Sequence, residues 1–202
     1  MSENNSEIKF TFDAVCFSTN YNNFSSISIM KQYFMTTDCS DINYIKDYHV
    51  EFKHKLLLEN GQQMLSINSF YEISSFSKAN RICDKADCFI IFFDLENNES
   101  LLELNKILKY IKETCDNEKK IFLINIFTNE NDIKSNFTQD NIKSCFSNCS
   151  LNNYSINTVN MDSSEELAKN IDSITGEILQ EKKSLNSGNF DLDNSKSGCL
   201  II

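Results

Sequence analysis

The chain has no proline and no tryptophan, four glycines, and a single arginine, Arg81, among its 202 residues. The scarcity of arginine, the lack of any basic run and a net charge of -10 argue against nucleic-acid binding, which needs clustered Lys and Arg to contact phosphates. The first glycine is Gly61, which excludes a glycine-rich loop before it. No apolar run approaches the roughly 20 residues of a transmembrane helix, and the start of the chain lacks a signal-peptide pattern.

What the chain does contain is a supply of large apolar side chains. Hydrophobic residues make up 41% of the sequence, with 16 Phe and 7 Tyr, and the length suits one compact domain with a tail. Eight cysteines are present. Cys145 and Cys149 share the spacing of one helix face, but neither His49 nor His54 is near them in sequence, so we interpret the internal cysteines as reduced and structural.

Apolar strand patterns alternate with amphipathic helix patterns along the chain, which predicts an α/β fold. Strands are expected at 8–17, 50–58, 62–67, 88–95, 121–127 and 154–160. Helices are expected at 25–34, 74–85 and 138–149, and after the capping-box patterns Ser100-x-x-Glu103 and Ser163-x-x-Glu166. We therefore expect a six-stranded, mostly parallel sheet with one antiparallel edge strand and helices on both faces. The domain would span 8–181, and 182–202 would form a flexible tail.

The chain ends in Cys199-Leu200-Ile201-Ile202, which is the C-a-a-X arrangement that prenyltransferases recognise. The preceding polar stretch has no apolar periodicity, as a tether would. We expect Cys199 to carry a prenyl group and the protein to be cytoplasmic, attached to the cytoplasmic face of membranes. Because one prenyl chain binds only marginally, that attachment would be reversible.

Several strings in the middle of the chain resemble the Rab branch of the Ras superfamily of small GTPases. They are His49-Val50-Glu51-Phe52, the segment ANRICDKADCFIIFFDLENNESL at 79–101, and FLINIF at 122–127. The resemblance implies a small-GTPase G domain and a role in vesicle trafficking or signalling. It also implies a prenyltransferase and a GDI-like or escort chaperone as partners, with trafficking effectors contacting the switch-equivalent segments 38–53 and 69–85.

The nucleotide-binding motifs of that family are eroded in this chain. The resemblance places Ser18, Asn23, Phe24 and Ser25 at the four defining positions of the phosphate loop, so the lysine is replaced by Phe24. Ser25 remains as a candidate magnesium ligand, although a Ser at a helix start is more often a cap. In the base-reading motif Asn125 remains, but Thr128 replaces the aspartate.

The switch motifs depart from the family pattern as well. The threonine of switch I becomes Asp47, the aspartate of switch II becomes Asn68 or Ser69, and its glycine becomes Tyr71 or Glu72. No catalytic residue is therefore assigned, and a catalysed GTPase cycle is not expected.

Three hypotheses remain open from the sequence. The first is a prenylated Rab-like pseudo-GTPase that works as a binding module with nucleotide binding weak or lost. The second is an atypical GTPase that binds GTP or GDP with magnesium because Asn20, Asn22 and Asn23 replace the loop glycines through left-handed conformations. The third is a different α/β protein, such as a small-molecule enzyme, although no His lies near a candidate nucleophile in the sequence.

Overall fold

The computed structural model describes residues 8–19, 25–35, 41–46, 49–58, 61–70, 76–95, 97–115, 119–127 and 139–193. In chain order the first six elements are β1 (Ile8–Ser18), α1 (Ser26–Met35), β2 (Asp41–Lys46), β3 (His49–Leu58), β4 (Gly61–Phe70) and α2 (Phe76–Lys85). The next six are β5 (Cys88–Phe93), α3 (Asn98–Thr114), β6 (Lys120–Phe127), α4 (Gln139–Asn148), β7 (Tyr154–Asn160) and α5 (Ser164–Asp193).

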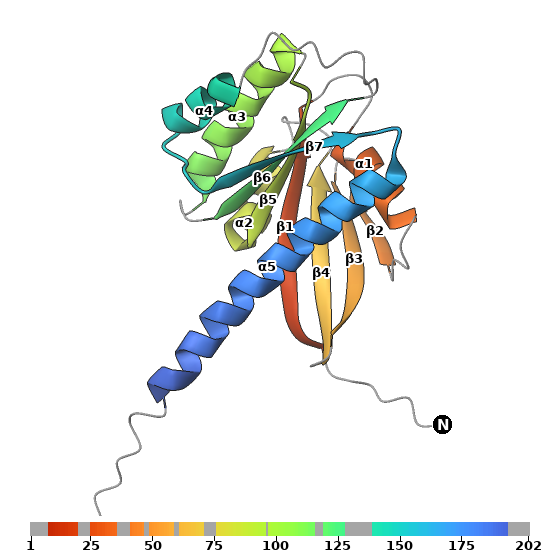
Figure 1. Cartoon of the computed structure of the whole chain (residues 1–202), viewed down its shortest axis with the longest axis vertical. Helices are drawn as coiled ribbons and strands as arrows, with labels where there is room; N and C mark the ends of the chain where they lie inside the picture. Colours follow the sequence, from red (N-terminus) through yellow and green to blue (C-terminus); the bar gives the residue numbers. More distant parts are fainter. Residues whose placement is uncertain are drawn as a thin grey trace, which may run out of the picture.

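The strands form one seven-stranded sheet in the order β2-β3-β4-β1-β5-β6-β7 (Figure 1). The α/β class and the mostly parallel sheet are confirmed, but the expected number of six strands is wrong because β2 was not predicted. Only β3 runs against the other strands, since it is antiparallel to both β2 and β4. The antiparallel strand is therefore second from the edge, whereas the sequence suggested an edge position.

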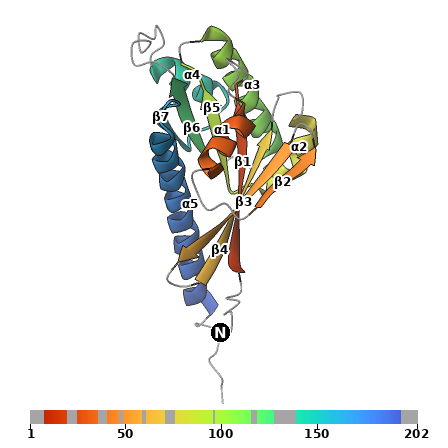
Figure 2. The same cartoon turned by 90° about the vertical axis from the view of Figure 1, so that its right-hand side faces the viewer.

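Two hydrophobic cores lie on opposite faces of the sheet. On one face, α1 and α5 cover the residues of β1, β5 and β6 that include Cys16, Phe92 and Ile124. On the other face, α2, α3 and α4 cover the alternate residues of the same strands. Figure 2 shows α5 on one side of the sheet and α2 and α3 on the other. The alternation follows from the period of two of a strand, and it accounts for the continuous apolar run of β5, which is buried on both faces.

Two helix starts were predicted from capping boxes, and they differ in outcome. At α5 the Ser163 hydroxyl accepts from the Glu166 N–H at 3.2 Å, as expected. At α3 the expected cap is wrong, because the helix begins earlier and Asn97 accepts from the Glu99 N–H at 2.8 Å. The hydroxyl of Ser100 is used elsewhere, as described below.

Helix α5 continues well beyond the globular part of the molecule (Figure 1). Its buried face consists of Leu167, Ile171, Ile174 and Ile178, as the sequence predicted. The helix runs to Asp193, so residues 182–193 of the expected tail 182–202 are helical. Cys199 lies outside the described residues. None of the helices in the described ranges combines the length and apolarity that a membrane crossing requires.

Candidate functional site

In parallel α/β sheets ligands bind at the carboxyl ends of the strands, where β1 is followed by α1 in this chain. Ser18 ends β1, and its buried hydroxyl accepts the backbone N–H of Ser26, the first residue of α1, at 2.8 Å. The hydroxyl of Ser26 in turn donates to the carbonyl oxygen of Phe70 at the end of β4, also at 2.8 Å. These two bonds fix the start of α1 against β1 and β4.

Ser25 acts as the N-cap of α1. Its hydroxyl accepts the Ser28 N–H at 3.1 Å, and its carbonyl oxygen accepts the Ile29 N–H at 3.0 Å. The candidate residues Asn23 and Phe24 lie outside the described residues, as do Asn20 and Asn22. The N–H groups of Ser26 and Ser28 therefore already have protein acceptors at the helix end where a phosphate would otherwise bind.

A second set of polar contacts joins the end of β1 to the start of α3. The Thr19 N–H donates to the Phe92 carbonyl oxygen at 3.0 Å, and the hydroxyls of Thr19 and Ser100 lie 2.6 Å apart in a buried position. Ser100 also accepts the backbone N–H of Asp94 at 2.9 Å. This explains why Ser100 does not cap α3, since its oxygen is engaged with β1 and with the end of β5.

Asn125 retains a structural role at the end of β6. Its side-chain oxygen accepts the backbone N–H of Leu95 at 2.9 Å, which ties the loop after β5 to β6. Thr128, the other candidate base-reading residue, lies outside the described residues. Asn125 is thus brought close to the loop after β5, but its acceptor atom already has a donor in the protein.

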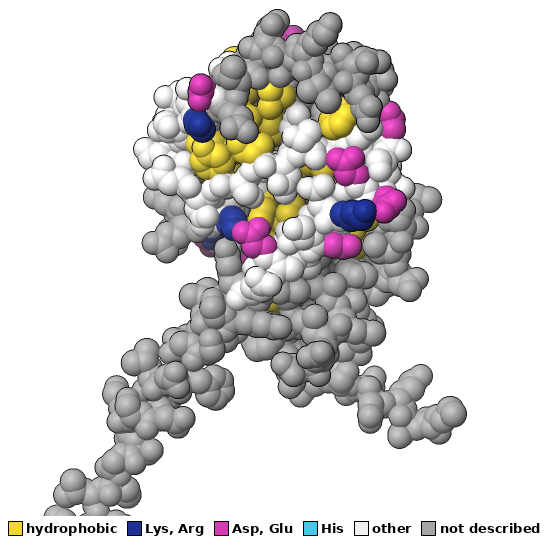
Figure 3. Space-filling model, viewed as in Figure 1, with side chains coloured by type: hydrophobic (Ala, Val, Ile, Leu, Met, Phe, Trp, Pro, Cys, Tyr) yellow, Lys and Arg dark blue, Asp and Glu magenta, His cyan; other side chains and the backbone are white. Residues whose placement is uncertain are grey.

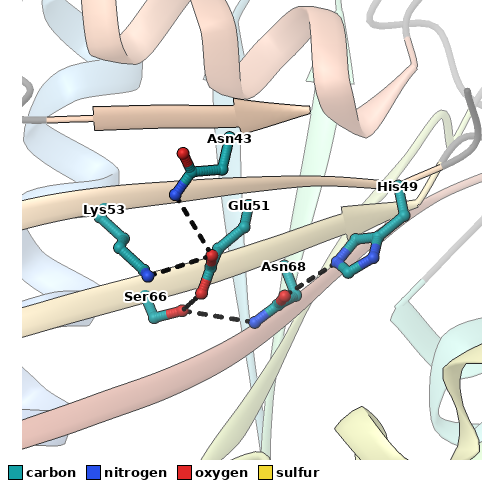
Figure 4. Close-up of polar contacts among 6 residues, drawn as sticks. All are labelled: Asn43, His49, Glu51, Lys53, Ser66 and Asn68. Atoms are coloured by element: carbon teal, nitrogen blue, oxygen red, sulfur yellow. Dashed lines mark hydrogen bonds and ion pairs between the residues drawn. The ribbon is translucent and has the colours of Figure 1, made fainter. Parts of the chain in front are cut away.

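One of the two positions that the resemblance assigns to the switch II aspartate carries a buried polar pair. His49 Nε2 lies 2.9 Å from the side-chain oxygen of Asn68, and the imidazole stacks on Phe70 with 4.5 Å between ring centroids. An amide oxygen only accepts, so His49 donates. Figure 4 shows this pair reaching from β3 to β4 on the face of the sheet that faces α2.

The same face carries a chain of contacts centred on Glu51 (Figure 4). The carboxylate of Glu51 accepts from the Ser66 hydroxyl at 3.0 Å and lies 3.2 Å from the ammonium of Lys53. Asn68 donates to Ser66 at 3.4 Å, which joins the two groups of contacts. Sequence reasoning did not find this network. The signal was present in the alternation of polar residues along both strands of the hairpin, at positions 49, 51 and 53 and at 66 and 68.

The described cysteines are all free, which agrees with their interpretation as reduced. Burial raises the pKa of Cys83 to about 12, and burial likewise raises the pKa of the fully enclosed Cys16 thiol. Among the described residues, no group of three or more His, Cys, Asp or Glu side chains is placed to hold a metal ion. The cysteines therefore act as small apolar core residues at neutral pH.

No family model matches this sequence, and no curated protein matches it either. At the carboxyl ends of β1, β5 and β6 the described hydroxyl, amide and N–H groups are bonded to one another, which holds the loops together.

The lysines visible on the face shown in Figure 3 lie beside carboxylates, whereas several Asp and Glu side chains there stand apart from any lysine. The ion pairs of the described residues include Lys120 with Glu177 and Lys169 with Glu165. These lysines therefore do not gather into a basic patch on the described part of that face.

Proposed function

We propose that the chain is a Rab-like G-domain protein that serves as a membrane-recruited binding module in vesicle trafficking or signalling, with nucleotide binding weak or lost. The observation that carries this proposal is the start of α1. The Ser26 and Ser28 N–H groups, which a phosphate would use, donate to the hydroxyls of Ser18 and Ser25. A bound phosphate would have to displace these bonds without the help of a loop lysine.

The arrangement of the sheet supports the same proposal. A strand leads into α1, a hairpin follows, and the central strand pairs in parallel with β4 on one side and β5 on the other, which is compatible with a P-loop-like α/β fold. The interaction surface would lie on the segments 38–53 and 69–85. Within the first of them the described strands β2 and β3 are hydrogen-bonded to each other.

We expect protein purified without added nucleotide to contain no GTP or GDP and to give no binding signal with a fluorescent GTP analogue. The physical reason is the combined loss of the loop lysine and the loop glycines, each tenfold loss of affinity corresponding to about 1.4 kcal/mol. Chromatography of the denatured protein measures the retained nucleotide.

Retained guanine nucleotide would contradict this proposal and favour the asparagine-rich phosphate loop. The variant Asn23→Ala distinguishes that case, because it would then release the nucleotide. The variant Asn148→Ala at the end of α4 is the control for loss of an asparagine side chain.

We expect Cys199→Ser to move the protein entirely into the soluble fraction when cells are fractionated, because the proposed prenyl chain is its membrane anchor. The control is Cys149→Ser, which removes a thiol from the globular domain and should leave the partition unchanged. The partners implied are a prenyltransferase and a GDI-like chaperone. If Cys199→Ser leaves the membrane partition unchanged, the proposed prenylation of Cys199 is wrong. The proposed loss of nucleotide binding would not be affected by that result.

A further inference from the structure

Strand β2 ends the sheet beside β3 (Figure 1), and it carries exposed apolar side chains. Tyr44 is 66% exposed, Ile45 is 48% exposed and Ile42 is 38% exposed. These three large hydrophobic residues lie within four consecutive positions of β2. The other large exposed hydrophobic residue in the described part of the chain is Leu102, which lies on α3. One edge of the sheet therefore combines an outer strand with apolar groups in contact with water.

Edge strands are usually protected from pairing by charged side chains, by proline or by a bulge that twists them away. The four central residues of β2, at 42–45, are uncharged, and the chain has no proline. A register shift occurs between Tyr44 and Lys46, but the pairs from Asp41 to Tyr44 are regular. Among the described strands, β2 has β3 on one side and no neighbour on the other, so the regular part of its outer edge can pair with another strand.

We propose that two copies of this chain associate through β2, antiparallel, with Asn43 of one copy opposite Asn43 of the other. The proposal goes beyond the function proposed above and does not depend on nucleotide or lipid. The two sheets would become continuous across a twofold axis normal to the sheet, and the outer edge of each β2, which pairs with no described strand, would gain a neighbour.

Symmetry restricts the register of such a pair. In an antiparallel pair, directly opposite residues point to the same face, so the sum of their two numbers must be even for identical strands. Centring on Asn43 places Ile42 opposite Tyr44 twice, which gives two β-branched–aromatic cross-strand pairs. Centring on Tyr44 would instead place Asn43 opposite Ile45, beyond the regular part of the strand, where the register shift before Lys46 interrupts the pairing. The register at Asn43 is therefore favoured.

The charges of β2 also fit pairing with a second copy. The strand begins with Asp41 and ends with Lys46, so its two ends carry opposite signs and its net charge is zero. Antiparallel pairing brings the acidic start of β2 in one copy towards the basic end of β2 in the other. Each copy has a net charge of -10, so the remaining charge opposes association at a distance. Screening by salt should therefore strengthen the dimer.

The ring of Tyr44 is already held in position for this contact. The ammonium of Lys31 on α1 lies 4.8 Å from its centroid, which places Tyr44 on the α1 side of the sheet. On the opposite side Asn43 donates to Glu51 at 3.5 Å (Figure 4). Both contacts come from the same copy, so the side chains that would meet a second strand are oriented before it arrives.

Sedimentation equilibrium of the full-length protein tests the proposal. We expect a mass that rises from 23.3 kDa towards twice that value with concentration, with a dissociation constant on the order of 100 μM because the interface is small. Tyr44→Lys should weaken the association by about tenfold or more, since it places a charge on the edge. Leu102→Lys is the matched control, because that residue is 63% exposed on α3 and should leave the dimer intact.

A charge exchange tests the register. Asp41→Lys alone should weaken the dimer, whereas Asp41→Lys combined with Lys46→Asp should restore it, because the ends of opposite sign then meet again. A mass that stays at 23.3 kDa at all concentrations would overturn the proposal. That result would also be seen if β2 pairs with a strand of another protein instead of a second copy. Dimers that persist in Tyr44→Lys, or that weaken equally in Leu102→Lys, would overturn it as well.

Discussion

Replacing Phe92 with alanine is expected to lower the free energy of unfolding by about 4 kcal/mol, because Phe-to-Ala changes in cores cost about 3–5 kcal/mol. Phe92 lies on β5 with no exposed surface, in the core beneath α1 and α5. Its backbone pairs with Ser18 on β1 and Ile124 on β6, so the cavity would open at the centre of the sheet. A loss of this size is a large part of the 5–15 kcal/mol that stabilises a typical domain.

Urea unfolding measures the effect of this substitution. With a slope of about 2 kcal/mol/M, the midpoint should fall by about 2 M at unchanged slope. Phe92→Leu keeps much of the side-chain volume and should lose clearly less, so the comparison remains possible if the alanine variant does not fold. Leu102→Ala on the exposed side of α3 is the matched control and should change the free energy by about 0.5 kcal/mol or less. Equal midpoints for Phe92→Ala and Leu102→Ala would contradict the core assigned here.

The elements that the sequence predicted correctly are those with continuous or periodic apolar patterns. The run from Cys88 to Phe93 is buried on both faces of the sheet. A central parallel strand that is buried on both faces needs apolar residues at every position, so this run was recognisable as a strand in the sequence. The strands expected at 50–58 and 62–67 pair with each other in the structure, from His49 with Phe70 to Leu58 with Gly61. The cap at Ser25 was also recognised, because capping depends on neighbours close in sequence.

The elements that the sequence did not predict depend on contacts between distant residues. Strand β2 is short and half exposed, and it forms because β3 pairs with it, so its own alternation was too weak to distinguish it from a loop. Ser100 looked like a cap, but its hydroxyl lies beside that of Thr19, which is 81 positions away. The bond between His49 and Asn68 spans two strands and leaves no signature at either position alone.

Stability is expected to fall steeply above pH 9, because two buried thiols stay protonated in the folded protein. Burial raises the pKa of Cys83 from 9.0 to about 12 and raises the pKa of Cys16 as well. Between pH 9 and 11 the unfolded chain has lost these protons and the folded chain still holds them, so each thiol costs about 1.4 kcal/mol per pH unit. Together they remove about 5 kcal/mol by pH 11, and full stability with respect to these groups is present below pH 9.

Urea unfolding at a series of pH values measures this slope, and Cys83→Ala should reduce it by about 1.4 kcal/mol per pH unit relative to the parent chain. The phenol of Tyr110 donates to Cys83 at 3.7 Å, and burial, followed by the neighbouring Cys83, raises the pKa of Tyr110. The two slopes are therefore compared between pH 9 and 10, below the range in which Tyr110 adds to the fall. Cys149→Ala is the control, because Cys149 is only partly buried: burial raises its pKa and the charges of Lys109 and Lys112 partly offset that rise, so the slope should change less than in Cys83→Ala. A slope that Cys83→Ala leaves unchanged would show that Cys83 ionises in the folded protein without cost.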